Sequence, residues 1–227
     1  MEKQNIVLTY KDGAVYGRDG EAYTGELTPF IKEIVEKLKS ISETGDKWSV
    51  FIQMAQIIGL SINSNRILSD KSKSTKSLRG EEPPITQGRD IYMALYSSAG
   101  GATANHIPIG YDLESVLVHE IAHVLMNRIG AGIEGYFVDP QNGRKSSNDE
   151  YGAVYFENLF RMEKGLTMRE YYSYDAMSRK GFNNVSLNEL ERISPNWKLN
   201  FRNRILTDTL YNAYTGITSR FASYFFP

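Results

Sequence analysis

One short helical stretch constrains this chain more than any other part of its sequence. Residues 119–123 read His-Glu-Ile-Ala-His, and they lie within residues 112–128, where apolar residues recur with the period of a helix. Residues four apart share one face of a helix, so the imidazoles of His119 and His123 can converge on a single ion. The sequence therefore predicts a metal-binding helix.

This pattern is typical of zinc peptidases. A zinc ion held by His119 and His123 lowers the pKa of a bound water molecule toward about 7, and Glu120 lies beside them to accept its proton. The chain has only 3 histidines in 227 residues, so a chance pairing at this spacing is a poor explanation. The alternative is that both histidines pack in an ordinary core. Asp112 and Gly130 are suitable caps for the helix.

The ion needs a third protein ligand, and no histidine follows His123. We therefore expect a carboxylate from a predicted helix that begins near residue 147. Glu150 is the favoured ligand, Glu157 is its main competitor, and Asp149 is a weaker one.

Each competing glutamate also has a purely structural explanation. Glu150 could close a capping box with Ser147, and Glu157 could form a surface ion pair with Arg161. A carboxylate two turns after the ligand could also support a metal-bound histidine from behind. His106 precedes the metal helix, and we expect it to be structural rather than a ligand.

The composition excludes several classes of partner. The chain has 26 basic and 27 acidic residues and a net charge of −1, which argues against nucleic-acid and membrane-surface binding. It has no cysteine, so disulfides, thiolate zinc ligands and a cysteine nucleophile are excluded. We see neither an apolar stretch of the ~20 residues that a membrane-spanning helix needs nor an export signal at the polar start.

Local patterns predict the other elements along the chain. The segment 69–89 carries scattered charges and a Pro-Pro pair without apolar periodicity, so we expect a flexible loop. The last aromatic residues should dock on the body of the protein. The expected elements are a hairpin over 5–17, helices over 28–42 and 46–59, strands over 60–68 and 90–96, a helix from 147, a short helix with a capping box at Ser186 and Glu189, a helix over 197–214, and an apolar tail of Phe221, Tyr224, Phe225 and Phe226.

Several of these patterns together resemble one protein family, the NleD-like zinc metallopeptidases among bacterial type III effectors. Related toxin domains share the arrangement. The resemblance covers about residues 20 to 175. It rests on Tyr23-Thr24-Gly25, the lead-in 107–112, the motif 119–123, the stretch 150–161 with Glu157-Asn158-x-x-Arg161, then Gly165 and Arg169-x-x-Tyr172.

The resemblance implies a zinc endopeptidase with one Zn²⁺ per chain. By that likeness the protein would be secreted by a type III-like route, with a secretion chaperone as a partner, and would act in the host cytoplasm. Its substrates would be host signalling proteins, with mitogen-activated protein kinases as the suspected class. The alternatives are a toxin peptidase of interbacterial competition on the same fold and a non-catalytic binding protein on a zincin scaffold.

Arg169 and Tyr172 resemble the pair with which clostridial neurotoxin light chains stabilise the negative oxygen of the tetrahedral intermediate. A guanidinium or phenol directed at that oxygen stabilises charge that develops only during the reaction. The structural alternative is that Tyr172 packs in an aromatic cluster with Tyr171 and Tyr174, while Arg169 pairs with a nearby glutamate.

The predicted fold class is α+β. We expect one zincin-like domain over residues 1–227, with a small mixed sheet, an edge strand at 90–96 beside the metal helix, and a mainly helical C-terminal half. Within it, 1–20 would form the N-terminal hairpin, 69–89 the flexible loop, and 176–227 a helical extension packed on the body.

Overall fold

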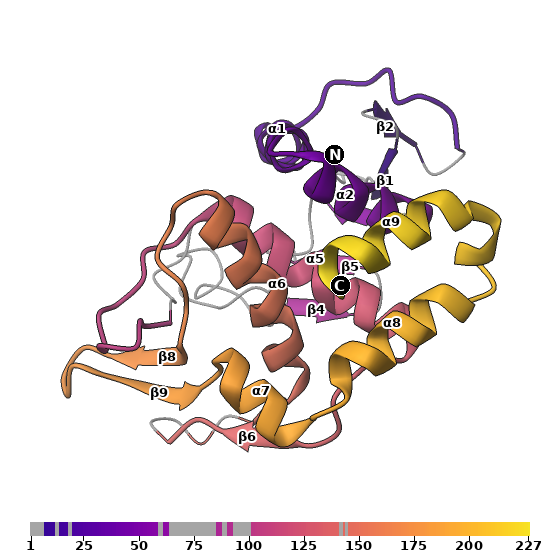
Figure 1. The fold of residues 1–227 in the computed structure, drawn as a ribbon. Coiled ribbons are helices and arrows are strands. Elements are labelled where there is room, and N and C mark those ends of the chain that lie inside the picture. The colour runs from indigo at the N-terminus through magenta and orange to yellow at the C-terminus, as the bar shows by residue number, and fades with distance from the viewer. Residues whose placement is uncertain are drawn as a thin grey trace.

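Two helices, α5 (Leu113–Ile129) and α6 (Asp149–Glu163), pack side by side at the centre of the computed structural model (Figure 1). All other elements are arranged around this pair. The structure describes residues 7–11, 14–17, 20–58, 61–63, 85–87, 90–92, 101–140, 143 and 145–227.

Helix α5 is the predicted metal helix, and both of its predicted caps are present. The Asp112 carboxylate accepts a hydrogen bond from the Ser115 amide at 2.8 Å, and Gly130 ends the helix with a left-handed φ of 62°. Glycine adopts this conformation without the steric cost that a Cβ imposes. Most side chains of α5 are buried, including Glu114, Ser115, His119 and Glu120, whereas Asn127 and Arg128 near its end are exposed. The part of the helix that carries the motif is therefore held within the protein.

Helix α6 starts differently from the sequence prediction. Asn148 is the N-cap residue, and the Ser147 hydroxyl accepts from the Asp149 amide at 3.2 Å. The capping box between Ser147 and Glu150 is therefore not the arrangement found at this end. Because Glu150 is not needed there, its side chain can turn toward α5.

The N-terminal helices form as expected. Helix α1 (Pro29–Glu43) begins at the N-cap Thr28, whose hydroxyl accepts from the Ile31 amide at 3.3 Å, and α2 (Asp46–Ile58) follows after a short turn. The Trp48 indole of α2 lies 4.9 Å from the Phe160 ring and donates a hydrogen bond to Glu163 at 2.8 Å. These contacts attach α2 to the far end of α6.

The main sheet has the strand order β2-β1-β3-β5-β4. Its only parallel pair among the described strands is β3 with β5, so the sheet is mixed as predicted. The strands are β1 (Val7–Lys11), β2 (Ala14–Tyr16), β3 (Ser61–Asn63), β4 (Ile85–Gln87) and β5 (Asp90–Tyr92). The expected N-terminal hairpin is the pair β1–β2.

The edge strand differs from the prediction. Strand β5 occupies the predicted segment, but it lies between β3 and β4, so it is not at the edge. The edge beside α5 is β4, which falls in the segment 69–89 that we expected to be a loop. The rest of that segment, and residues 93–96 of the predicted strand, lie outside the described residues.

The structure contains two further hairpins that we did not predict from the sequence. They are β6 (Tyr136–Val138) with β7 (Lys145–Ser147), and β8 (Tyr171–Asp175) with β9 (Lys180–Asn184). Strand β8 is also joined to the lead-in of α5, because the Ala102 amide donates to the Tyr171 carbonyl at 3.0 Å. The β9 strand also means that the segment 176–227 is not purely helical.

Helical elements make up the rest of the C-terminal segment: α7 (Leu187–Ile193), α8 (Trp197–Thr207), the 3-10 turn η1 (Tyr211–Tyr214) and α9 (Thr215–Phe225). The predicted capping box opens α7, since Ser186 accepts from the Glu189 amide. The predicted helix 197–214 is interrupted at Asp208, whose carboxylate accepts from the Leu210 amide at 2.9 Å and so starts a new turn.

The aromatic tail docks on the body, as expected for three of its four residues. Phe221, Phe225 and Phe226 are buried, whereas Tyr224 is 37% exposed. The Phe225 ring lies 5.3 Å from that of Phe156 on α6.

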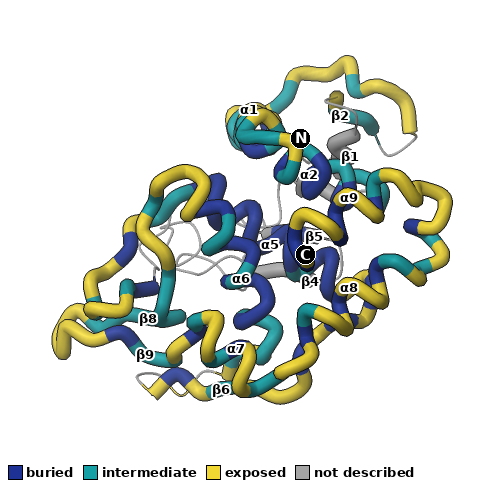
Figure 2. Tube along the Cα trace, viewed as in Figure 1, coloured by how far each residue is buried: buried dark blue, intermediate teal, exposed yellow. Residues whose placement is uncertain are grey.

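The buried positions gather where α2, α5, α6 and α9 face one another (Figure 2). The described part of the chain is of the α+β class: it combines helices with one mixed sheet and two small antiparallel hairpins. None of the described helices has the length and apolarity needed to cross a membrane.

Candidate metal centre

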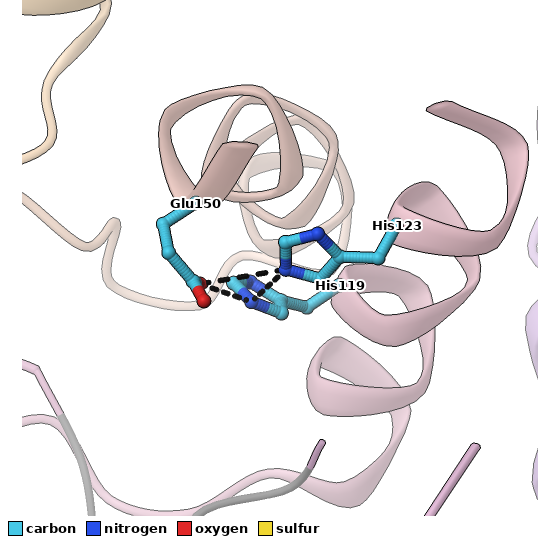
Figure 3. A group of neighbouring side chains, drawn as sticks. All are labelled: His119, His123 and Glu150. Carbon is cyan, nitrogen blue, oxygen red and sulfur yellow. Dashed lines mark hydrogen bonds and ion pairs between the residues drawn. The ribbon is translucent and has the colours of Figure 1, made fainter. Parts of the chain in front are cut away.

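The side chains of His119, His123 and Glu150 converge between α5 and α6 (Figure 3). The Nε2 atoms of the two imidazoles are 3.3 Å apart. One carboxylate oxygen of Glu150 lies 3.0 Å from Nε2 of His119 and 3.4 Å from Nε2 of His123. Three ligand atoms of the types that zinc prefers therefore form a small triangle.

The size of this triangle matches a metal site. Ligand atoms about 2.0 Å from a tetrahedral zinc ion are separated by about 3.3 Å. The three observed separations, 3.0, 3.3 and 3.4 Å, bracket that value. The group could therefore hold a metal ion without rearrangement of α5 or α6.

Glu157 lies on the opposite side of the His119 ring. Its carboxylate is 3.1 Å from Nδ1 of His119, whereas Glu150 faces Nε2 of the same ring. Glu157 is 0% exposed, so the expected surface ion pair with Arg161 is instead a buried one, at 3.6 Å. Arg169 also approaches the Glu157 carboxylate, at 3.3 Å.

This arrangement separates the two glutamates by chemistry. A hydrogen bond from Nδ1–H of His119 to Glu157 leaves the Nε2 lone pair directed at the space beside Glu150. Glu150 can therefore share an ion with His119, while Glu157 can fix the ring's orientation and protonation.

The charges around His119 favour a cation. Burial lowers the pKa of His119, but hydrogen bonds to Glu150 and Glu157, together with their negative charges, outweigh it and raise the pKa to about 10. Burial also opposes ionisation of Glu150, yet the charge of His123 and hydrogen bonds to both histidines lower its pKa well below the usual range. A positive charge between these side chains is therefore favoured, whether it is the proton of His119 or a divalent ion.

Glu120 projects from the same helix and is 4% exposed. Its negative charge contributes to raising the pKa values of two phenols, Tyr111 and Tyr172, although burial is the larger cause for both. The carboxylate, the two phenols and the triangle of ligand atoms therefore belong to one electrostatic environment. Sequence reasoning missed Tyr111, whose only signal is its position directly before the N-cap Asp112.

Tyr172 and Arg169 occupy different places in this environment. The pKa of Tyr172 lies well above its usual value because of burial and the charge of Glu150, so the phenol keeps its proton. A hydrogen bond with Ser146 and an edge contact with the Phe137 ring, 5.3 Å between centroids, attach it to the β6–β7 hairpin. Arg169 instead directs its guanidinium at Glu157.

His106 is not part of the metal group. Its Nδ1 accepts a hydrogen bond from the Gly181 amide at 3.0 Å, and its ring stacks on Tyr171 with the centroids 4.6 Å apart. The third histidine therefore joins the lead-in of α5 to the β8–β9 hairpin.

Comparison with known proteins finds no family model, no curated protein and no solved structure that matches this chain.

Proposed function

We propose that this chain is a zinc-dependent endopeptidase that holds one Zn²⁺ between His119, His123 and Glu150. The observation that carries the proposal is the triangle of two Nε2 atoms and one carboxylate oxygen, with the separations expected for a tetrahedral zinc site. Three protein ligands leave a fourth position for water or substrate, which is the pattern of catalytic rather than structural zinc sites.

The residues around the ion divide the chemical work. When bound, zinc supplies Lewis-acid activation of water and of the scissile carbonyl. Glu120 takes the proton of the attacking water on its carboxylate and then delivers it to the leaving amine. Glu157 accepts the Nδ1–H of His119 and so keeps the Nε2 lone pair directed toward the ion.

Tyr172 is the proposed donor to the developing negative oxygen. Its raised pKa keeps the phenol protonated at neutral pH, as a hydrogen-bond donor must be. Arg169 adds positive charge nearby but is paired with Glu157, so its proposed contribution is electrostatic and passes through that carboxylate.

The fold supports a peptide substrate. The mixed sheet beside α5, with the motif helix next to an edge strand, is the arrangement that we expect of a zincin-like domain. Among the described strands, β4 pairs only with β5. Its other edge can bind an extended substrate by strand addition, so β4 takes the role that we first assigned to 90–96.

The biological setting is proposed from the resemblance to type III effectors. In that setting the enzyme leaves the bacterium by a type III-like route with the help of a chaperone. It then cleaves signalling proteins in the host cytoplasm, and mitogen-activated protein kinases are the first substrates to test.

The test combines zinc content, proteolysis and one isosteric variant. Purified protein should bind one zinc ion per chain and generate new protein N-termini in a eukaryotic cell extract. The E120Q variant should bind zinc equally well but cleave at least about 1,000-fold more slowly, because glutamine cannot accept the proton. The matched control is E36Q, at an exposed position of α1, which should cleave normally.

Two results would contradict the proposal. Folded protein that takes up no zinc at neutral pH would exclude the metal site. An E120Q variant that cleaves as fast as the unaltered protein would remove Glu120 from the reaction.

A further inference from the structure

In the segment between α6 and β8, one side chain binds both backbone groups of a single residue. Asn158 of α6 makes two hydrogen bonds to the backbone of Arg169: its Oδ1 accepts from the Arg169 amide at 2.7 Å, and its Nδ2 donates to the Arg169 carbonyl at 2.7 Å. The carboxamide thus pairs with both backbone groups of one residue, as a neighbouring strand would.

Two further bonds secure the same segment. The Arg161 guanidinium donates through Nε to the Thr167 carbonyl at 2.5 Å, and the Tyr171 amide donates to the Ala102 carbonyl at 2.9 Å. Asn158 acts between these two points. It fixes the last residues before β8, the strand that carries Tyr172.

The place of Asn158 in α6 relates this anchor to the metal centre. Its neighbour Glu157 contacts Nδ1 of His119, and the side chain of the anchored residue, Arg169, contacts Glu157. One turn of α6 therefore sets the orientation of a metal ligand and the start of the strand that follows. Three residues beyond the anchor, the Tyr172 ring lies 5.3 Å from that of Phe137, which also contacts the ring of Tyr151, the residue after Glu150.

We propose that Asn158 is a positioning residue: by binding the backbone of Arg169, it holds the Tyr172 phenol at the place where the scissile oxygen becomes negative. This inference rests on the proposed peptidase function. The positioning role requires a hydrogen-bond donor and an acceptor on one short side chain. Aspartate offers no donor at neutral pH, and alanine offers neither group.

The test is a double-mutant cycle with Tyr172. N158A should lower kcat about 10- to 100-fold, because small displacements of an aligned group cost rates of this size, while zinc affinity and KM stay within about twofold. In a Y172F background, N158A should have little further effect, because the group that it positions is already gone. N158D, which keeps the size of the side chain and its acceptor, should also lower kcat.

A second readout does not require activity. In protein labelled with 3-fluorotyrosine, the ¹⁹F resonance of Tyr172 is the one lost in Y172F. N158A and N158D should shift or broaden that resonance. N200A, at an exposed position of α8, is the matched asparagine control and should leave it unchanged. Alanine favours helix, so N158A should not weaken α6 itself.

The outcomes separate the two proposals. If the unaltered protein cleaves nothing, the peptidase function fails, but the ¹⁹F signal still tests the anchor. An unchanged Tyr172 resonance in both Asn158 variants would overturn the positioning role. Equal losses of kcat from N158A with and without the Tyr172 hydroxyl would also overturn it, because Asn158 would then act elsewhere.

Discussion

The helix pair α5–α6 and strand β8 approach the same site, but they are held in different ways. His119 and Glu157 of the helix pair are at most 6% exposed and are fixed by contacts between side chains. Tyr172 of β8 is more exposed than these residues, and its strand is positioned mainly through backbone hydrogen bonds. Metal binding and stabilisation of reaction charge should therefore respond to different substitutions.

The largest expected effect is at Glu150. Removing one of three protein ligands should cost more than the 10- to 100-fold loss of affinity typical of supporting residues, so E150A should bind zinc at least about 1,000-fold more weakly. Competition with a chelator measures this affinity, and activity should fall with zinc occupancy. If Glu157 substitutions release zinc more readily than E150A does, the two glutamates exchange roles.

On β8, the Y172F variant should show the opposite behaviour. It lacks only the hydroxyl, so zinc affinity should stay unchanged while kcat falls about 100-fold, the usual cost of one donor to a developing oxyanion. Steady-state kinetics on zinc-saturated protein measures this difference. A loss of zinc in Y172F would remove the distinction between helix pair and strand.

Glu157 contacts His119 of the helix pair and Arg169, which precedes β8, so E157Q should lower both zinc affinity and stability. Zinc affinity should fall about 10- to 100-fold, because the support of His119 is weakened. Stability should fall by about 3 kcal/mol, because Arg161 and Arg169 lose a buried carboxylate. Urea unfolding of the metal-free protein measures this loss, and E36Q is again the surface control. An unaltered unfolding curve would show that the two arginines do not depend on Glu157.

The smallest expected effect is the change in zinc affinity over one pH unit. The pKa of His119 is raised from 6.5 to about 10 in the folded protein. Protonation of His119 therefore stabilises the folded state fully below pH 6.5, and this stabilisation is lost as pH rises through 10. Zinc must displace the proton from the folded protein, so zinc affinity should increase by up to about tenfold per pH unit as pH rises toward 10. Calorimetry in buffers of different ionisation enthalpy should detect one proton released at pH 8. Binding without proton release would place His119 in its neutral form before zinc arrives.

The metal helix could be predicted from sequence because its signals are local. Asp112, Gly130 and the spacing of His119 and His123 are all properties of one continuous segment. The sequence favoured Glu150 over Glu157 as the third ligand, but it could not give the atoms that each one contacts, because both lie on one face of one helix. Which nitrogen of His119 each glutamate reaches depends on how α6 packs against α5.

Other differences have the same physical origin. Strand β4 is an edge because of its pairing with β5, and β5 is internal because β3 lies on its other side. Strand order depends on pairing between distant segments, which the periodicity of apolar residues does not predict. Strand β8 was also missed, because its tyrosines fit both a packed cluster and a strand. The sequence placed Asn158 in the Glu157-Asn158-x-x-Arg161 motif but did not predict that it binds the backbone of Arg169.

The aromatic tail gives α6 a second constraint, away from the candidate metal centre. Phe225 packs on Phe156, the residue next to Glu157. The helix therefore contacts an aromatic cluster on one side and a charged cluster on another. Such a helix has little freedom to roll about its axis. Apolar substitutions in the tail, far from the candidate metal centre, should therefore change the rate of zinc release. That rate would then report on how well the tail packs against α6.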